Sequence, residues 1–129
     1  MIRRTVSIFL LFAVFLSAGC SAKIARYGYT LEDIQKNNNA SDFFIPIKKN
    51  FVYNKDEVEI LGEIKAGDTG FSTDCNEGHV LNIFRQEACA LKADLINIIY
   101  ERNTDMLSSC YRAKAQFLRF KNREKVKNL

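Results

Sequence analysis

The spacing of apolar residues along this chain predicts a strand between residues 57 and 65. Apolar and charged residues alternate there with a period of two, which is typical of a strand that is buried on one face. The expected apolar face consists of Val58, Ile60, Gly62 and Ile64. Because Gly62 has no side chain, a neighbouring element is expected to approach the strand closely at that residue.

After a glycine-rich turn, the spacing changes to that of a helix. Asp74 and Glu77 stand at the spacing of a capping box, so the helix should begin near them. Apolar residues then recur three or four positions apart, as on one face of an amphipathic helix. That face consists of Val80, Phe84, Ala88 and Leu91. The helix should end between residues 91 and 93, with Cys89 on its polar, exposed side.

The pattern beyond the helix predicts two more strands. Residues 95–100 form an apolar-rich run that is too short for a separate helix, so we expect a central strand there. Residues 109–120 alternate in part, and the small Ala113 and Ala115 are expected to lie under the helix. This order favours a right-handed crossover with a parallel pair of strands, to which the final strand is added antiparallel. The predicted fold class is α+β, with one amphipathic helix packed on a small sheet in the order β-α-β-β.

The residues before this unit give weaker signals. Residues 43–47 and 51–53 are β-prone, and Pro46 confines the first segment to an edge strand or a loop. Thr30 stands where it would cap one or two helical turns. The expected organisation is a signal over residues 1–19, a tether over 20–42, an α+β domain over 43–120 and a basic tail over 121–129.

The first twenty residues resemble the leader of a bacterial lipoprotein. Arg3 and Arg4 precede an apolar run over residues 6–16, and small residues then lead to Cys20. This order is that of a secretory signal, and Leu-Ser-Ala-Gly-Cys over residues 16–20 resembles a lipobox. In lipoproteins the cysteine is acylated and becomes the first residue of the mature chain. The apolar run is shorter than the roughly 20 residues that span a bilayer core, which disfavours an uncleaved membrane helix.

The residue after Cys20 indicates a cellular location, and the charge disfavours a nucleic-acid partner. Ser21 follows Cys20, in place of the Asp that retains lipoproteins in the inner membrane, so we expect the outer membrane, facing the periplasm. The chain has 129 residues and a net charge of +4, of which Arg3 and Arg4 leave with the signal. A nucleic-acid binder would show a clustered basic face, so no nucleic-acid partner is expected. The remaining length fits one small domain.

Three cysteines remain for the exported domain, and an oxidising compartment allows one bridge among them. The βαββ layout brings Cys75 and Cys110 to one edge of the sheet, which favours a bridge between them. Such a bridge would contribute roughly 3 to 4 kcal/mol of stability by the loop-entropy model. Cys89 then remains as a thiol outside the bridge, either a spectator or a redox-active group.

The other polar residues do not form a catalytic pattern. His79, Asp74 and Cys75 lie close in sequence, but a structural zinc takes four ligands, so we expect no metal and no cofactor. The serines lack a Gly-x-Ser-x-Gly motif, and the chain has one histidine, so we expect no enzyme. The residues proposed for contact with a partner are Asp68, Phe71, Tyr111 and Arg112.

Several stretches of the chain resemble the globular domain of the RcsF-like stress-sensor lipoproteins. They are residues 63–72 with Asp68-Thr69-Gly70-Phe71-Ser72, Cys75, Glu87-Ala88 with Leu91-Lys92-Ala93-Asp94-Leu95-Ile96, and Ser109-Cys110-Tyr111-Arg112-Ala113-Lys114-Ala115. They are also similar to the small YbjQ-like domains, whose glycine after the helix is missing here. The resemblance covers about residues 57–120 and implies an α+β fold with a Cys75–Cys110 disulfide. The second disulfide and the proline-rich linker of the RcsF-like proteins have no counterpart in this sequence.

These observations predict a lipid-anchored envelope lipoprotein that faces the periplasm. Cys20 would hold it to the membrane, and the domain would act through protein contacts in stress sensing or envelope assembly. Two other hypotheses stay open from the sequence alone. One is a redox function of Cys89, and the other is the binding of a metal or small ligand by His79 and Asp74.

Overall fold

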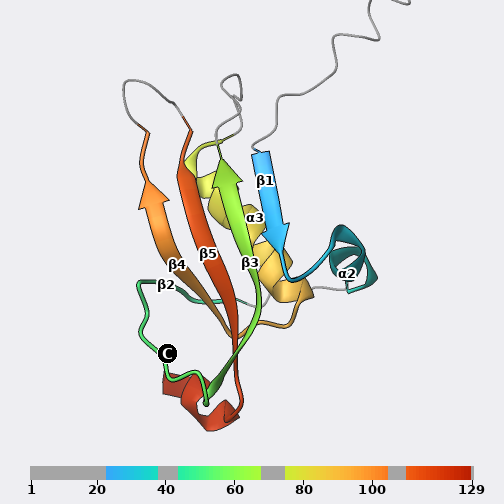
Figure 1. The fold of residues 1–129 in the computed structure, drawn as a ribbon, viewed down its shortest axis with the longest axis vertical. Coiled ribbons are helices and arrows are strands. Elements are labelled where there is room, and N and C mark those ends of the chain that lie inside the picture. The colour runs from blue at the N-terminus through green and yellow to red at the C-terminus, as the bar shows by residue number, and fades with distance from the viewer. Residues whose placement is uncertain (1–22, 38–43, 68–74, 105–109, 129) are drawn as a thin grey trace, which may run out of the picture.

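The chain folds into a five-stranded sheet with helices beside it (Figure 1). The computed structural model describes residues 23–37, 44–67, 75–104 and 110–128. The elements are β1 (Lys23–Tyr27), α2 (Leu31–Lys36), β2 (Ile47–Lys49), β3 (Val58–Gly67), α3 (Glu77–Ala90), β4 (Leu95–Arg102), β5 (Arg112–Phe120) and the 3-10 helix η2 (Arg123–Asn128). The predicted α+β class is therefore confirmed, with two α-helices in place of the single one expected.

The strands lie in the order β1-β3-β5-β4-β2, so the last strand of the chain occupies the middle of the sheet. β3 and β4 both pair antiparallel with β5. They therefore run in the same direction, as a strand-helix-strand unit predicts, but β5 separates them. β2 forms an edge by pairing parallel with β4, and it begins directly after Pro46. That placement agrees with the expectation from the proline.

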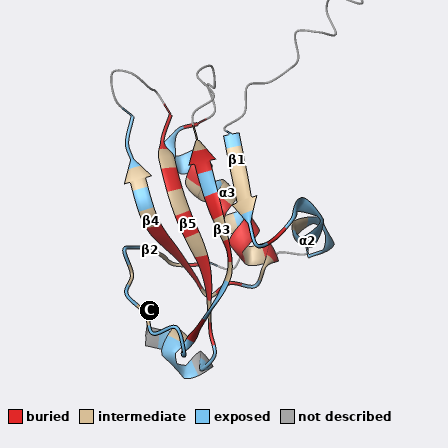
Figure 2. Ribbon diagram, in the orientation of Figure 1, coloured by how far each residue is buried: buried red, intermediate tan, exposed pale blue. Residues whose placement is uncertain are grey.

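Helix α3 covers one face of the sheet and forms the main core with it (Figure 2). Val80, Phe84 and Ala88 are fully buried on the inner side of the helix. The small Ala113 and Ala115 of β5 belong to the same cluster, as predicted. Large side chains fill the rest of this core: Ile64, Ile96, Ile98 and Phe117.

The ends of α3 lie close to those predicted, but its first turn is capped differently. The helix begins at Glu77, and the side chain of Asn76 accepts a hydrogen bond of 2.9 Å from the His79 backbone N–H. Asp74, the predicted cap, lies outside the described residues. At the other end Lys92 adopts a left-handed backbone with φ of 58°, a conformation that favours glycine.

Strand β3 contains an irregularity that the period-two pattern did not reveal. Ile60 pairs with Leu118 and Gly62 pairs with Phe117, so Leu61 is an extra residue, a β-bulge. One inserted residue moves the following side chains to the opposite face. The prediction that Val58, Ile60, Gly62 and Ile64 share one face is therefore wrong: the first two lie on the face away from α3.

The close approach predicted at Gly62 is confirmed. A Cβ atom added there would lie 2.9 Å from the backbone carbonyl oxygen of Tyr27 and would also clash with the Tyr29 ring. Both tyrosines belong to the N-terminal segment that runs along β3. Gly62 therefore lets that segment pack tightly against the sheet.

Residues 23–36, which the sequence assigned to the tether, form an edge strand and a helix. β1 pairs antiparallel with β3, with Lys23 opposite Gly67 and Tyr27 opposite Glu63. Thr30 and Asp33 form a capping box at the start of α2, as the sequence indicated. The sheet thus takes its edge strand from outside the predicted 43–120 domain.

A buried carboxylate ties β1 to helix α3. The Arg26 guanidinium forms an ion pair with the Glu87 carboxylate through Nη2 and Nε. The Tyr29 hydroxyl donates a hydrogen bond to the same carboxylate. Burial raises the pKa of Tyr29, and the hydrogen bond to Glu87 adds to this shift. Glu87 is 4% exposed, and burying a charge is tolerated here because both partners compensate it.

A second, smaller core lies on the other face of the sheet, at the end nearest η2. It contains Val58, Leu95, Leu118 and Phe120, with Phe51, Tyr53 and Val126 packed against them. Residues 51–53 were predicted to be β-prone but do not form a strand. The buried Asn97 side chain holds this segment instead, since it accepts from the Phe51 N–H at 2.8 Å and donates to the Phe51 carbonyl at 3.1 Å.

Candidate functional site

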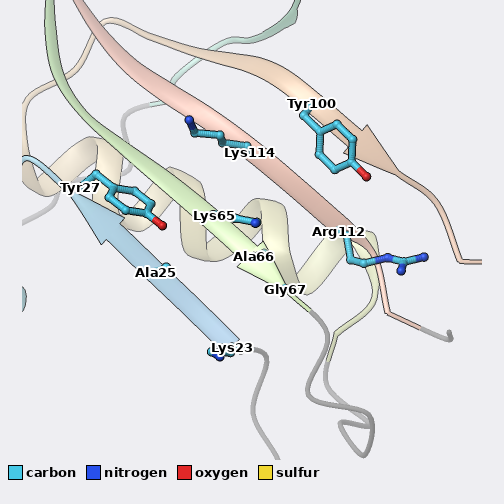
Figure 3. Close-up of a pocket in the computed structure, with 9 residues that line it drawn as sticks. All are labelled: Lys23, Ala25, Tyr27, Lys65, Ala66, Gly67, Tyr100, Arg112 and Lys114. Atoms are coloured by element: carbon cyan, nitrogen blue, oxygen red, sulfur yellow. The ribbon is translucent and has the colours of Figure 1, made fainter.

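The face of the sheet away from α3 is hollowed into a groove beyond the second core (Figure 3). Its volume is about 660 Å³, and β1, β3, β4 and β5 all contribute to it. The lining residues are Lys23, Ala25, Tyr27, Lys65, Ala66, Gly67, Tyr100, Arg112 and Lys114. Helix α3 lies behind the sheet in this view, so the groove is formed on the open face. We take the groove as the candidate functional site.

Strand register places the polar side chains of the groove on one face. Ala25 lies opposite Lys65, and Lys65 lies opposite Lys114, which itself lies opposite Tyr100. Directly opposed residues point to the same side of a sheet. The intervening residues of these strands, such as Ile64 and Ala113, point into the main core. The alternation that buries one set of residues therefore gathers the basic set on the open face.

The groove is positively charged. Lys23, Lys65, Lys114 and Arg112 line it, and the described lining residues include no carboxylate. Lys114 forms an ion pair of 2.6 Å with Glu63, which lies beside the groove. The hydrogen bonds from Lys114 and Gln116 lower the pKa of Glu63. Within the described part of the chain, no ion pair involves Lys23 or Lys65, so these two ammonium groups face solvent and any ligand.

Two tyrosines flank the basic residues. Tyr27 is 53% exposed and Tyr100 is 51% exposed, and both side chains lie on the groove side (Figure 3). Each phenol offers an apolar ring and a hydroxyl that donates a hydrogen bond. Cations with exposed tyrosines form a surface that binds negatively charged groups. The lining set includes no nucleophile paired with a base, so the chemistry that it supports best is binding.

Of the four residues predicted to contact a partner, Tyr111 and Arg112 belong to the described part of the chain, and Arg112 lines the groove. Tyr111 points to the opposite face and is 1% exposed, so it is not available for a partner. Its hydroxyl donates to Glu101 at 2.8 Å, and burial followed by this hydrogen bond raises the pKa of Tyr111. Asp68 and Phe71 lie outside the described residues.

The structure confirms the predicted disulfide but not the predicted exposure of Cys89. Cys75 and Cys110 form a disulfide, and both are 2% exposed. The Tyr111 backbone N–H donates to the Cys75 carbonyl at 2.8 Å, which adds a second link beside the bridge. Cys89 was predicted to be exposed, but it is half-buried and packs against the main core. The helix turns it further inward than its polar neighbours suggested. Cys20 lies outside the described residues.

The candidate metal ligands His79 and Asp74 cannot be compared directly, because Asp74 lies outside the described residues. His79 is exposed in the first turn of α3, as the sequence indicated, and its described surroundings supply no ligand set. No group of three or more His, Cys, Asp or Glu residues in the described ranges is placed to hold an ion. No described helix is both long and apolar enough to cross a membrane.

Comparison with known proteins leaves the family open. No family model matches the sequence, and no curated protein or solved structure is significantly similar to it. The resemblance to the RcsF-like and YbjQ-like domains therefore stays a prediction. The function has to be argued from the groove and the sequence.

Sequence reasoning missed most of the groove. Lys23 and Tyr27 fell in the predicted tether, and Tyr100 was assigned only to an apolar run. Lys65 was placed on the polar face of its strand, and Lys114 on the polar side of the last strand. Those two alternating patterns were the available signal, but only the pairing of β3 with β5 shows that they meet.

Proposed function

We propose that this protein is a lipid-anchored envelope lipoprotein that faces the periplasm and acts by binding, without catalysis. The leader and the lipobox-like segment before Cys20 support the anchor. The Cys75–Cys110 disulfide agrees with an oxidising compartment. The outer membrane is the proposed location because Ser21 follows Cys20.

The observation that carries the binding function is the basic groove on the open face. Three strands that lie far apart in sequence, β1, β3 and β5, present Lys23, Lys65, Lys114 and Arg112 to the same space. Polar side chains on an open sheet face are normally scattered charges of both signs. A concave site lined by cations of one sign attracts anionic ligands. We propose that the groove recognises anionic groups of the envelope, and that stress sensing or envelope assembly depends on this contact.

The anchor is tested by metabolic labelling with palmitate in the host that secretes the protein. The wild-type protein should incorporate the label, and Cys20→Ser should not. Cys89→Ser is the matched control, because it removes a thiol from the domain and should leave labelling unchanged. A wild-type protein without label would contradict the proposal.

The binding site is tested by photocrosslinking in native envelopes. A photoreactive residue at Tyr100 should give a crosslinked product with an envelope component, and the same residue at Val52 should give little. Val52 is a suitable control because it is 91% exposed but lies in the segment that covers the second core. Equal products at both sites would count against the groove.

A further inference from the structure

We infer that the groove docks on anionic phospholipid headgroups of the same membrane that holds Cys20. The open face of the sheet then lies against the membrane, and the α3 face is turned towards the periplasm. This inference rests on the proposed acylation of Cys20. It identifies the anionic groups that the groove recognises and the orientation of the domain.

The position of β1 in the sequence supplies the first argument. Two residues separate Cys20 from Lys23, the first residue of β1 and a lining residue of the groove. Three residue steps span roughly 10 Å even when they are fully extended. The Debye length at physiological ionic strength is about 8 Å. Once Cys20 is acylated, the nearest end of the groove therefore lies at most little more than one screening length from the membrane surface.

The strand directions bring other cations to this same end. β1 is antiparallel to β3, so Lys23 at the start of β1 lies beside Gly67 at the end of β3. β5 is antiparallel to β3 in turn, and it begins at Arg112. Arg102, at the end of β4, lies directly opposite Arg112. The basic residues are thus concentrated at the end of the sheet that the anchor holds to the membrane.

The side-chain chemistry matches a headgroup layer. Lysine and arginine are attracted to the negative surface potential of anionic lipids, and their effect falls off within a Debye length. Tyrosine is enriched where an apolar body and a wet polar end are both satisfied, as at a membrane interface. Tyr27 and Tyr100 are each about half exposed in the groove, at 53% and 51%. A lipid anchor with an adjacent basic patch is a common way to fix a protein on a membrane.

An acidic segment of another protein is the competing ligand, and the position of the groove argues against it. Such a segment would have to enter between the sheet and the membrane. The membrane surface lies roughly 10 Å from Lys23, the first residue of β1. The headgroups are already present at high local concentration because of the anchor. The observations therefore favour the lipid.

The experiment uses single tryptophan probes, because the natural chain contains no tryptophan. The lipidated mature protein is purified with Tyr100→Trp and reconstituted into phosphatidylcholine vesicles with or without about a third phosphatidylglycerol, a fraction chosen to give a strongly anionic surface. Lipids brominated near the headgroup end of the acyl chains quench a tryptophan that lies at the interface. We expect strong quenching at position 100 in the anionic vesicles and weak quenching in the neutral ones.

Phe44→Trp is the matched probe on the other face. Phe44 is 82% exposed and lies beside Arg85 of α3, so the docked orientation keeps it away from the membrane. Its quenching should be weak in both kinds of vesicle. Equal quenching at the two positions would overturn the proposed orientation.

Charge variants test the role of the groove in the same assay. Each basic residue near an anionic surface strengthens binding about fivefold, so Lys23→Gln with Lys65→Gln should weaken docking about 25-fold. Lys36→Gln with Lys55→Gln removes the same charge from exposed positions outside the groove and should have little effect. Equal effects of the two pairs would overturn the groove as the docking surface. Quenching at position 100 that does not depend on phosphatidylglycerol would also overturn it. A change in tryptophan fluorescence that appears only when an envelope protein is added would do the same.

The two proposals fail in different ways. Mass analysis of the N-terminal peptide shows whether Cys20 carries lipid, and its absence would refute the anchor. A lipidated Tyr100→Trp protein whose quenching ignores phosphatidylglycerol would refute the docking and leave the anchor intact.

Discussion

The two sides of strand β5 have opposite environments. On the side under α3, Ala113, Ala115 and Phe117 are all fully buried. On the other side, Arg112, Lys114 and Gln116 are only half-buried, whereas Leu118 and Phe120 are covered by the second core. The same strand is therefore buried along its length on one face. On the other face only its C-terminal part is covered by a hydrophobic core. The uncovered half is the groove.

This difference predicts that mutations can change stability and the proposed binding separately. The residues that fill the main core are buried hydrophobic side chains, and their loss costs both transfer and cavity free energy. The groove residues are surface cations, whose replacement usually changes stability by less than about 0.5 kcal/mol. Variants on the two faces of the sheet should therefore differ sharply in their effects on folding.

The largest expected effect is that of Phe117→Ala. Phe117 is fully buried, so this change should lower the free energy of unfolding by about 3 to 5 kcal/mol. Lys65→Ala, on the open face of the neighbouring strand, is the control and should change it by less than about 0.5 kcal/mol. Urea denaturation followed by circular dichroism measures both. Similar losses of unfolding free energy for the two variants would contradict the proposed difference between the two faces of the sheet.

The disulfide should have the next largest effect. Cys75 and Cys110 are 35 residues apart, so replacing both by Ala should cost about 3 to 4 kcal/mol in the loop-entropy model. Cys89→Ala removes the described cysteine that lies outside the bridge and should cost less, because Cys89 is only half-buried. Non-reducing peptide mapping of the wild type should link Cys75 to Cys110. A peptide that links Cys89 to either residue would contradict the structure.

A smaller loss is expected from Glu87→Gln, which breaks the ion pair between β1 and α3. Breaking a fully buried ion pair costs about 3 to 5 kcal/mol, and Arg26 remains partly exposed, so we expect about 2 to 3 kcal/mol. The Arg26 side chain is 21% exposed, whereas that of Glu87 is 6% exposed. Replacing both residues by Leu should recover much of the loss, because no charge then stays buried. If the double variant did not recover stability, the ion pair would contribute more free energy than is needed to offset the cost of burying its two charges.

The smallest effect should come from the ion pair on the open face. Lys114 and Gln116 lower the pKa of Glu63, so the ionised carboxylate stabilises the fold above its unfolded pKa near 4.5. This contribution is lost as the pH falls through the lower folded pKa. Lys114→Met should lower stability by less than about 1 kcal/mol at pH 7 and change it little near pH 2. Unfolding curves at the two pH values measure this, and a difference that does not vary with pH would be evidence against the pair.

The parts of the fold that could be predicted are those set by local periodicity. Helix α3 followed from apolar residues three and four positions apart, and β5 followed from alternation around its two small alanines. The capping box at Thr30 is also a local signal. In each case the decisive residues are neighbours in the sequence.

The parts that were missed depend on distant partners. The bulge at Leu61 exists only in the pairing of β3 with β5, so the alternation in the sequence gives no sign of it. β1 carries Arg26 on its inward face, and a charged residue there hides the strand pattern in the sequence. The residue that pairs with its charge, Glu87, lies 61 residues away. The groove could not be predicted for the same reason, since Lys23 and Lys65 meet only after β1 pairs with β3.

The position of β5 in the sheet has a consequence for when the chain can fold. β3 and β4 each pair with β5, and in the described part of the chain they do not pair with one another. The three inner strands therefore cannot assemble before β5, which begins at Arg112, is present. Ribosomes deliver the N-terminus first, so β3, α3 and β4 are all made before the strand that joins β3 to β4. Until β5 is made, β3 and β4 each lack the strand with which both of them pair.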